Sequence, residues 1–144
     1  YKGIYRPSNP KKYKGDSQNI IYRSLWERKF MNYCDLNENI LEWASEEFWI
    51  PYLDPTTNRV RRYFPDFFIK YKDKDSNIRR SVIEVKPMRE TLEPKATKGK
   101  SRKTLMSESI TYVKNQAKWK AAREFCDDRK LEFKIMTEKE LGIR

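Results

Sequence analysis

The sequence predicts an α/β fold in which helices flank a mixed β-sheet. Two long stretches carry apolar residues at three- and four-residue spacing, which is the periodicity of amphipathic helices. Shorter segments rich in aromatic and β-branched residues lie between and after them, bounded by Pro, Asn, Asp and Ser, as is typical of strands. The order helix, three strands, helix, strand predicts a three-stranded antiparallel meander and a crossover to a C-terminal strand.

The N-terminal part is expected to contain a basic arm and the first helix. Two prolines and two glycines interrupt any periodic pattern in residues 1–17, so we expect an extended arm there and a folded domain over residues 18–144. A helix over residues 18–38 is predicted by apolar residues at helical spacing, namely Leu25, Trp26, Phe30, Tyr33, Cys34 and Leu36. Ser24 supports a second interpretation, because serine is a favoured N-cap and a helix could begin directly after it.

Three strands should follow over residues 40–53, 59–72 and 78–86. The first stops at Pro55 before a polar turn. The third stops at Pro87, because proline donates no hydrogen bond to a neighbouring strand. The two turns between these strands are short, which is why an antiparallel arrangement is expected.

The C-terminal half is expected to hold a loop, a long helix and a last strand. Residues 87–106 contain two prolines, a glycine and many lysines, and a loop of this length is either functional or mobile. A helix over residues 107–130 should bury one apolar face formed by Ile110, Val113, Ala117, Ala121 and Phe125. A strand over residues 131–137 follows, and Thr137 should begin a short helical turn.

The charge of the chain favours a polyanionic partner. The net charge is +11 and the mean hydropathy is −1.00. A basic surface of this size favours contact with nucleic acid, although it could also serve only solubility. The excess is clustered in residues 1–14 and 86–103, so we expect contacts with double-stranded DNA from Lys11, Lys12, Lys14, Arg61, Arg62, Lys95, Lys98, Lys100, Arg102 and Lys103. No apolar run resembles a membrane span or a signal peptide, so no membrane partner is expected.

The few soft ligands exclude several kinds of chemistry. The chain has no histidine and two cysteines, Cys34 and Cys126. This excludes the usual zinc sites and the catalytic arrangements that pair histidine with serine or cysteine. Both cysteines lie in helical patterns, where a free thiol packs as a small apolar residue. Enzymatic chemistry would therefore depend on carboxylates, lysine and a metal ion.

Charged residues stand inside two of the predicted strands. Asp66 lies in Tyr63-Phe64-Pro65-Asp66-Phe67-Phe68, and Glu84 and Lys86 lie in Val82-Ile83-Glu84-Val85-Lys86. Residues two apart on a strand share a face, so Glu84 and Lys86 should point together, away from Ile83 and Val85. If the two strands form a hairpin, Asp66 lies near Glu84. Paired carboxylates suit Mg²⁺ or Mn²⁺, whereas the alternative is a buried salt bridge of Lys86 with either acid.

Pro65-Asp66, eighteen residues before Glu84-Val85-Lys86, resembles the signature of the PD-(D/E)XK nucleases. The order of elements over residues 20–137 is also similar to the core of that superfamily. The resemblance implies hydrolysis of DNA with Mg²⁺ or Mn²⁺ held by Asp66 and Glu84, and with Lys86 beside them. Glu27 matches an acid on the first helix of many members, and we expect the metal ligands to be Glu27, Asp66, Glu84 and Val85.

Further motifs resemble the head-completion endonucleases of contractile-tailed bacteriophages. They are Asn9-Pro10-Lys11-Lys12-Tyr13, Ile21-Tyr22-Arg23-Ser24-Leu25-Trp26-Glu27, Trp43-Ala44-Ser45-Glu46-Glu47, Arg62-Tyr63-Phe64-Pro65-Asp66-Phe67 and Asn115-Gln116-Ala117-Lys118-Trp119. This resemblance implies action on packaged DNA ends, capsid or portal proteins as partners, and a location in the host cytoplasm or the virion. Gln116 is a candidate for contact with the metal site or DNA, or it is a solvated surface residue. Glu46 and Glu47 match the motif without an assigned role.

Two other functions fit the same motifs. The first is a DNA-binding capsid-completion protein that keeps the nuclease fold without activity, although intact Asp66, Glu84 and Lys86 argue against it. The second is a transposon- or junction-type endonuclease, which shares the acids and the lysine over less of the chain.

Overall fold

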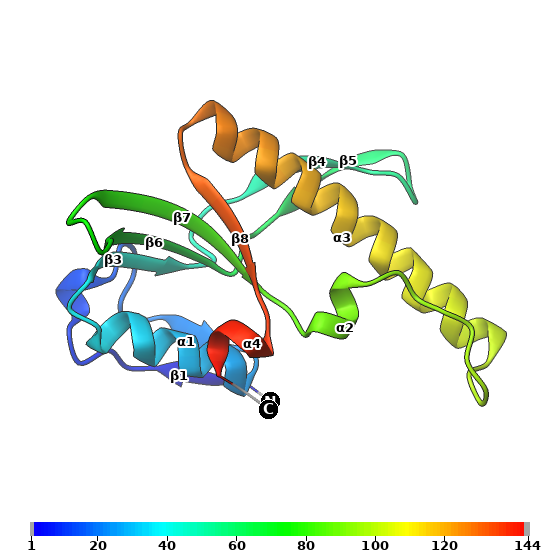
Figure 1. The fold of residues 1–144 in the computed structure, drawn as a ribbon, viewed down its shortest axis with the longest axis horizontal. Coiled ribbons are helices and arrows are strands. Elements are labelled where there is room, and N and C mark those ends of the chain that lie inside the picture. Colours follow the sequence, from blue (N-terminus) through cyan, green and yellow to red (C-terminus); the bar gives the residue numbers. More distant parts are fainter. Residues whose placement is uncertain (1, 143–144) are drawn as a thin grey trace.

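Helices cover both faces of a four-stranded sheet in the structure, a computed structural model that describes residues 2–142 (Figure 1). The strands lie in the order β3 (Ile40–Ser45), β6 (Phe67–Lys72), β7 (Ile78–Val85) and β8 (Glu132–Met136). The first three pair antiparallel, whereas β8 runs parallel to β7. The predicted mixed sheet, with an antiparallel meander and a C-terminal strand, is confirmed.

The first two predicted strands are each divided in two. The chain leaves the sheet after β3 to form a hairpin of β4 (Ile50–Asp54) and β5 (Arg59–Tyr63), and then returns as β6. Glu46 adopts a positive φ of 53° directly after β3, so the backbone turns there although the apolar pattern continues. Figure 1 shows the hairpin lying beside the long helix α3 (Arg102–Asp128), apart from the central sheet.

The first helix begins later than the apolar pattern indicated. Helix α1 (Leu25–Leu36) starts after Ser24, whose hydroxyl accepts a hydrogen bond from the Glu27 N–H at 3.1 Å. The second interpretation, with Ser24 as the N-cap, is therefore confirmed and a helix from residue 18 is wrong. Strand β2 (Ile20–Tyr22) precedes the helix instead and pairs with β1 (Gly3–Tyr5).

The N-terminal segment is docked on the domain, so the expectation of an extended arm is wrong. Buried Asp35, near the end of α1, accepts hydrogen bonds from the Tyr5 hydroxyl at 3.0 Å, the Ser8 N–H at 2.7 Å and the Asn9 N–H at 2.9 Å. A single 3₁₀ turn, η1 (Pro10–Lys12), follows, and Tyr13 is buried against β3. A buried carboxylate with this many donors is well satisfied, which fixes the segment in place.

Two apolar cores lie on opposite faces of the sheet. The core on the α1 side contains Phe30, Trp43, Phe67, Ile83 and Val85. The core on the α3 side contains Ile50, Tyr52, Tyr63, Trp119 and Ala122, and it joins the hairpin to α3. Both cysteines are free and buried, as predicted.

Helix α3 buries a different face from the one expected. It begins at Arg102 rather than at residue 107, and its buried residues are Asn115, Trp119, Ala122 and Cys126. Ile110 and Val113 remain 44% and 41% exposed, because the N-terminal half of α3 projects beyond the sheet (Figure 1). The preceding segment, predicted as loop, contains one short helix, α2 (Met88–Thr91).

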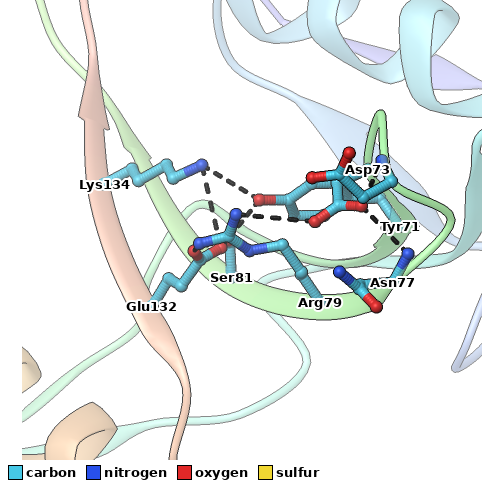
Figure 2. Close-up of polar contacts among 8 residues, drawn as sticks. Tyr71, Asp73, Asn77, Arg79, Ser81, Glu132 and Lys134 are labelled. Atoms are coloured by element: carbon cyan, nitrogen blue, oxygen red, sulfur yellow. Dashed lines mark hydrogen bonds and ion pairs between the residues drawn. The ribbon is translucent and has the colours of Figure 1, made fainter.

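A polar network ties the strands together at the far end of β7 from Glu84. Figure 2 shows Glu132 of β8 receiving hydrogen bonds from the Tyr71 hydroxyl at 2.8 Å and the Ser81 hydroxyl at 2.6 Å, with Arg79 paired to the same carboxylate. Burial would raise the pKa of Glu132, but these hydroxyls and the nearby Lys134 and Arg79 lower it below its ordinary value. The network joins three strands and stabilises the parallel β7–β8 pair.

The chain ends in a short capped helix. Helix α4 (Glu138–Leu141) begins with a capping box between Thr137 and Glu140, as the sequence predicted. Across residues 2–142, no helix combines the length and the apolar character needed to cross a membrane.

Candidate active site

Asp66 and Glu84 meet at the end of the sheet where β6 begins and β7 ends. The β6–β7 register places Phe67 across from Ile83, so the preceding Asp66 comes opposite Glu84. The carboxylate of Asp66 accepts a hydrogen bond from the Val85 N–H at 2.8 Å. The proximity expected from a hairpin of these two strands is therefore present.

Glu84 points to the α3 side of the sheet. Its neighbours Ile83 and Val85 belong to the core on the α1 side, so alternation along the strand turns Glu84 the other way. The Trp119 indole N–H donates to the Glu84 carboxylate at 3.0 Å, and Glu84 is only 4% exposed. One indole donor fixes the orientation of this buried carboxylate without neutralising its charge.

The two carboxylates destabilise each other's charged form. Burial raises the pKa of Asp66 well above its usual range, and the charge and hydrogen bonding of Glu84 add to the effect. The Val85 N–H opposes this shift but does not cancel it. Such a pair suits a bound cation, because a positive charge would stabilise both ionised acids.

The donor set fits a hard divalent ion. Mg²⁺ is typically held by one or two carboxylates, with water and phosphate oxygens completing its shell. Among the residues that the structure describes, no three Asp, Glu, Cys or His side chains lie close enough to hold one ion. The site therefore provides a carboxylate pair rather than a closed protein cage, which leaves room for substrate oxygens.

Glu27 lies at the edge of this pair, in the first turn of α1. Its carboxylate accepts the Arg23 N–H at 3.1 Å. Burial is the main cause that raises the pKa of Glu27, and the charges of Glu46 and Glu84 raise it further. Glu46, which had no assigned role, forms an ion pair with Arg23 at 3.3 Å and donates its N–H to the Asp66 carbonyl at 3.2 Å.

Lys86 has a free ammonium group beside the carboxylates. It follows β7 directly, and its backbone N–H donates to the Met136 carbonyl at 2.9 Å. The side chain is partly exposed and makes no ion pair or hydrogen bond with any residue of the 2–142 range. The alternative of a buried salt bridge between Lys86 and either acid is therefore wrong.

Helix α3 brings side chains to the site that the sequence did not single out. Trp119 binds Glu84, and the Lys118 ammonium lies over the rings of Tyr52 and Tyr63, at 5.8 and 5.9 Å from their centres. Burial raises the pKa of Tyr63, and the charges of Glu84 and Asp66 raise it further.

Gln116, the candidate from this helix, is partly exposed and its side chain forms no hydrogen bond within the described part of the chain. The family motif Asn115-Gln116-Ala117-Lys118-Trp119 marked the right turn of the helix. The correct face could have been found from the spacing of Asn115, Trp119, Ala122 and Cys126.

Four of the expected DNA contacts have partners within the protein. The Lys12 ammonium donates to the carbonyls of Asp35 and Asn37 at 3.1 and 2.8 Å, where the end of α1 leaves carbonyls without helical partners. The other three pairs are Arg61 with Asp54 at 3.1 Å, Arg62 over the Trp49 ring at 4.7 Å, and Lys100 with Glu108 at 3.0 Å.

The remaining basic candidates are exposed and lie in two separate places. They are Lys11 and Lys14 near η1, and Lys95, Lys98, Arg102 and Lys103 in the loop before α3 and its first turn. Figure 1 shows η1, in dark blue, and the 92–101 loop at opposite ends of the molecule. The loop continues from β7 and α2, so it is on the side of the carboxylate pair.

The chain is similar to known endonucleases over almost its whole length. A family model described as TnsA-like endonuclease N terminal matches residues 37–138, a range that includes Asp66, Glu84 and Lys86. The head completion nuclease of Enterobacteria phage T4 is 38% identical over 141 residues, which cover 96% of this chain and 91% of that protein. These matches confirm the resemblance to PD-(D/E)XK nucleases and to phage head-completion endonucleases. The chain belongs to the family of TnsA-like endonucleases.

Proposed function

We propose that this endonuclease hydrolyses phosphodiester bonds of double-stranded DNA with Mg²⁺ or Mn²⁺, using Asp66, Glu84 and Lys86. The observation that carries the proposal is the buried carboxylate pair beside an unpaired lysine at one end of the sheet. Structural ion pairs do not leave two acids and an amine adjacent but unpaired. Such an arrangement costs stability and is typical of active sites.

Asp66 and Glu84 would hold the ion, with the Val85 carbonyl beside them and Glu27 at the edge. A bound divalent ion polarises the phosphate and lowers the pKa of a coordinated water. The absence of histidine and of a thiolate cluster favours Mg²⁺ or Mn²⁺ over Zn²⁺. The role proposed for Trp119 is to fix the orientation of Glu84 through its indole N–H.

Lys86 would donate to the attacking water or to a phosphate oxygen as negative charge develops there. Attack by water in line with the leaving oxygen would leave a 5′-phosphate and a 3′-hydroxyl. Gln116 stays a weaker candidate for contact with DNA, because it lies one turn along α3 from the residues that reach Glu84.

We also propose that the substrate is a DNA end during completion of a phage head. The support is the printed name of the T4 relative together with its match over 96% of this chain. On this proposal the partners include capsid or portal proteins, and the protein acts in the host cytoplasm or remains in the virion.

Incubation of the purified protein with supercoiled plasmid and with linear duplex, in Mg²⁺, Mn²⁺ or EDTA, tests the proposed chemistry. We expect cleavage only with a divalent ion, and end-labelling should reveal 5′-phosphates. A folded protein that binds both DNAs but cuts neither would favour the non-catalytic capsid-completion alternative. Selective cutting of a four-way junction would favour the junction-type alternative.

The exposed cations of the 92–101 loop and the start of α3 are proposed to grip the DNA backbone. Contacts to phosphates release counterions, so the logarithm of affinity should fall linearly with the logarithm of salt concentration. Removing Lys98, Arg102 and Lys103 together should weaken binding to any duplex sequence and reduce the salt slope by about 0.9 per lost contact.

The matched control for this prediction removes Lys11 and Lys14, which are equally exposed but lie near η1 at the other end of the molecule. We expect a smaller effect from the control. Salt-independent binding by the wild-type protein would rule out a phosphate grip.

A further inference from the structure

Lys118 is a cation whose charge has no acidic partner in the protein. Its side chain is half-buried on α3, with the ammonium over the rings of Tyr52 and Tyr63. It forms no ion pair with any carboxylate of residues 2–142. Lys114, one turn earlier on the same helix, pairs with Asp54 at 3.8 Å. Aromatic rings stabilise an ammonium only in part, so Lys118 keeps the capacity to bind an anion.

The position of Lys118 places this charge next to the carboxylate pair. The following residue, Trp119, donates to Glu84, and Tyr63 under the Lys118 ammonium is affected by the charges of both Glu84 and Asp66. Burial lowers the pKa of Lys118, Glu84 raises it, and Lys86 and Lys114 lower it. Lys86 and Lys118 are therefore close enough to repel each other on the same side of the sheet.

Two neighbouring ammonium groups that lack acidic partners are unfavourable in the free protein. A phosphodiester between them would relieve this repulsion, because it supplies the missing negative charge and several acceptor oxygens. Nothing else on this face of α3 supplies an acid to Lys118, although Glu84 is near. The arrangement is therefore explained by a substrate anion better than by internal pairing.

We propose that Lys118 binds the scissile phosphate of the DNA as a second ammonium donor beside Lys86. The inference rests on the proposed function, since it assigns a substrate contact within the same site. A cation placed where charge develops in the transition state accelerates the reaction more than it strengthens ground-state binding. The competing explanation is that Lys118 only stabilises the packing of the β4–β5 hairpin on α3.

The first test compares Lys118→Met, which keeps the aliphatic stem, with Lys118→Arg, which keeps the charge. Lys114→Met is the matched control on the same helix. On a short duplex whose cut position has been mapped, we expect single-turnover cleavage by Lys118→Met to fall on the order of 100-fold. Lys118→Arg should recover part of the loss, and the control should stay within about threefold of the wild type, on the premise that surface changes are small.

Thermal melts accompany these rates, because a packing role would appear as lost stability. A Lys118→Met protein that melts much lower but cuts at the wild-type rate would overturn the proposal. Wild-type protein that cuts no DNA with Mg²⁺ or Mn²⁺ would instead contradict the proposed function itself, so the two failures are distinguishable.

The decisive test neutralises the phosphate instead of the protein. The mapped scissile phosphate is replaced by an uncharged methylphosphonate, and binding is measured with Ca²⁺ in place of Mg²⁺ over times too short for cleavage. The wild type should lose roughly tenfold in affinity, as expected for one charge-assisted contact. Lys118→Met should lose several-fold less, because its side chain no longer senses that charge. An equal loss in both proteins would overturn the proposal.

Discussion

Lys86→Ala is expected to reduce DNA cleavage by 10²–10³-fold, on the order of the loss when one preorganised donor is removed, while the fold and DNA binding persist. The Lys86 ammonium has no partner among the residues described, so its removal leaves no acid newly unpaired. The side chain is also partly exposed at the end of β7, so little cavity remains. Plasmid nicking and a thermal melt of the same preparation measure the two effects separately.

Lys134→Ala is the matched control for this variant. Lys134 is also a lysine at the surface of the sheet, but it belongs to the Glu132 network shown in Figure 2. We expect this control to cut at the wild-type rate. If Lys86 served only structure, its loss would cost about 3–5 kcal/mol, as for a broken buried ion pair. A Lys86→Ala protein that melts far lower and cuts normally would refute the catalytic role.

Asp66→Asn should remove both cleavage and most of the stabilisation by Mg²⁺. Ligands that bind only the native state stabilise it by mass action, by about 2.7 kcal/mol at a hundred times the dissociation constant. The asparagine carbonyl still accepts the Val85 N–H, so the local backbone is preserved. Because burial and Glu84 disfavour the ionised Asp66, the variant should melt as high as the wild type or higher in EDTA.

The measurement is a set of melting curves with and without Mg²⁺, beside a nicking assay. Glu132→Gln is a matched control, since it changes one carboxylate of the same sheet outside the site. It should keep the full Mg²⁺ shift. Glu27→Ala should lose part of the shift, because Glu27 lies at the edge of the pair. An equal Mg²⁺ shift in the wild type and Asp66→Asn would mean that Asp66 is not a ligand.

The parts of the fold that depend on local chemistry could be predicted from the sequence. Ser24 can cap α1 because its own hydroxyl reaches the helix N–H groups. The β6–β7 hairpin follows from two apolar runs and a polar turn, and its register alone brings Asp66 beside Glu84. The carboxylate pair was therefore predictable from strand periodicity, without any homologous structure.

The parts that depend on distant contacts could not be predicted in this way. The N-terminal segment docks through Asp35, and nothing in the local sequence marks that aspartate as an acceptor for residues 26 to 30 positions earlier. The hairpin β4–β5 leaves the sheet at Glu46, although the apolar pattern continues through the break.

The face of α3 was the error that mattered most for the site. Apolar Ile110 and Val113 suggested a buried stripe, but that half of the helix projects beyond the sheet and stays exposed. The wrong face left Gln116 as the candidate from this helix and overlooked Lys118 and Trp119. Periodicity gives the existence of an amphipathic helix, but the packing partner decides which face is used.

The nicking of supercoiled plasmid by Glu84→Gln tests the central claim most directly. Glutamine keeps the shape of the side chain and an oxygen that accepts the Trp119 indole N–H, and only the negative charge is lost. With Mg²⁺ present and both proteins folded, the wild type should nick the plasmid and Glu84→Gln should leave it supercoiled. Nicking by Glu84→Gln at the wild-type rate would contradict the assignment of this carboxylate pair as the active site.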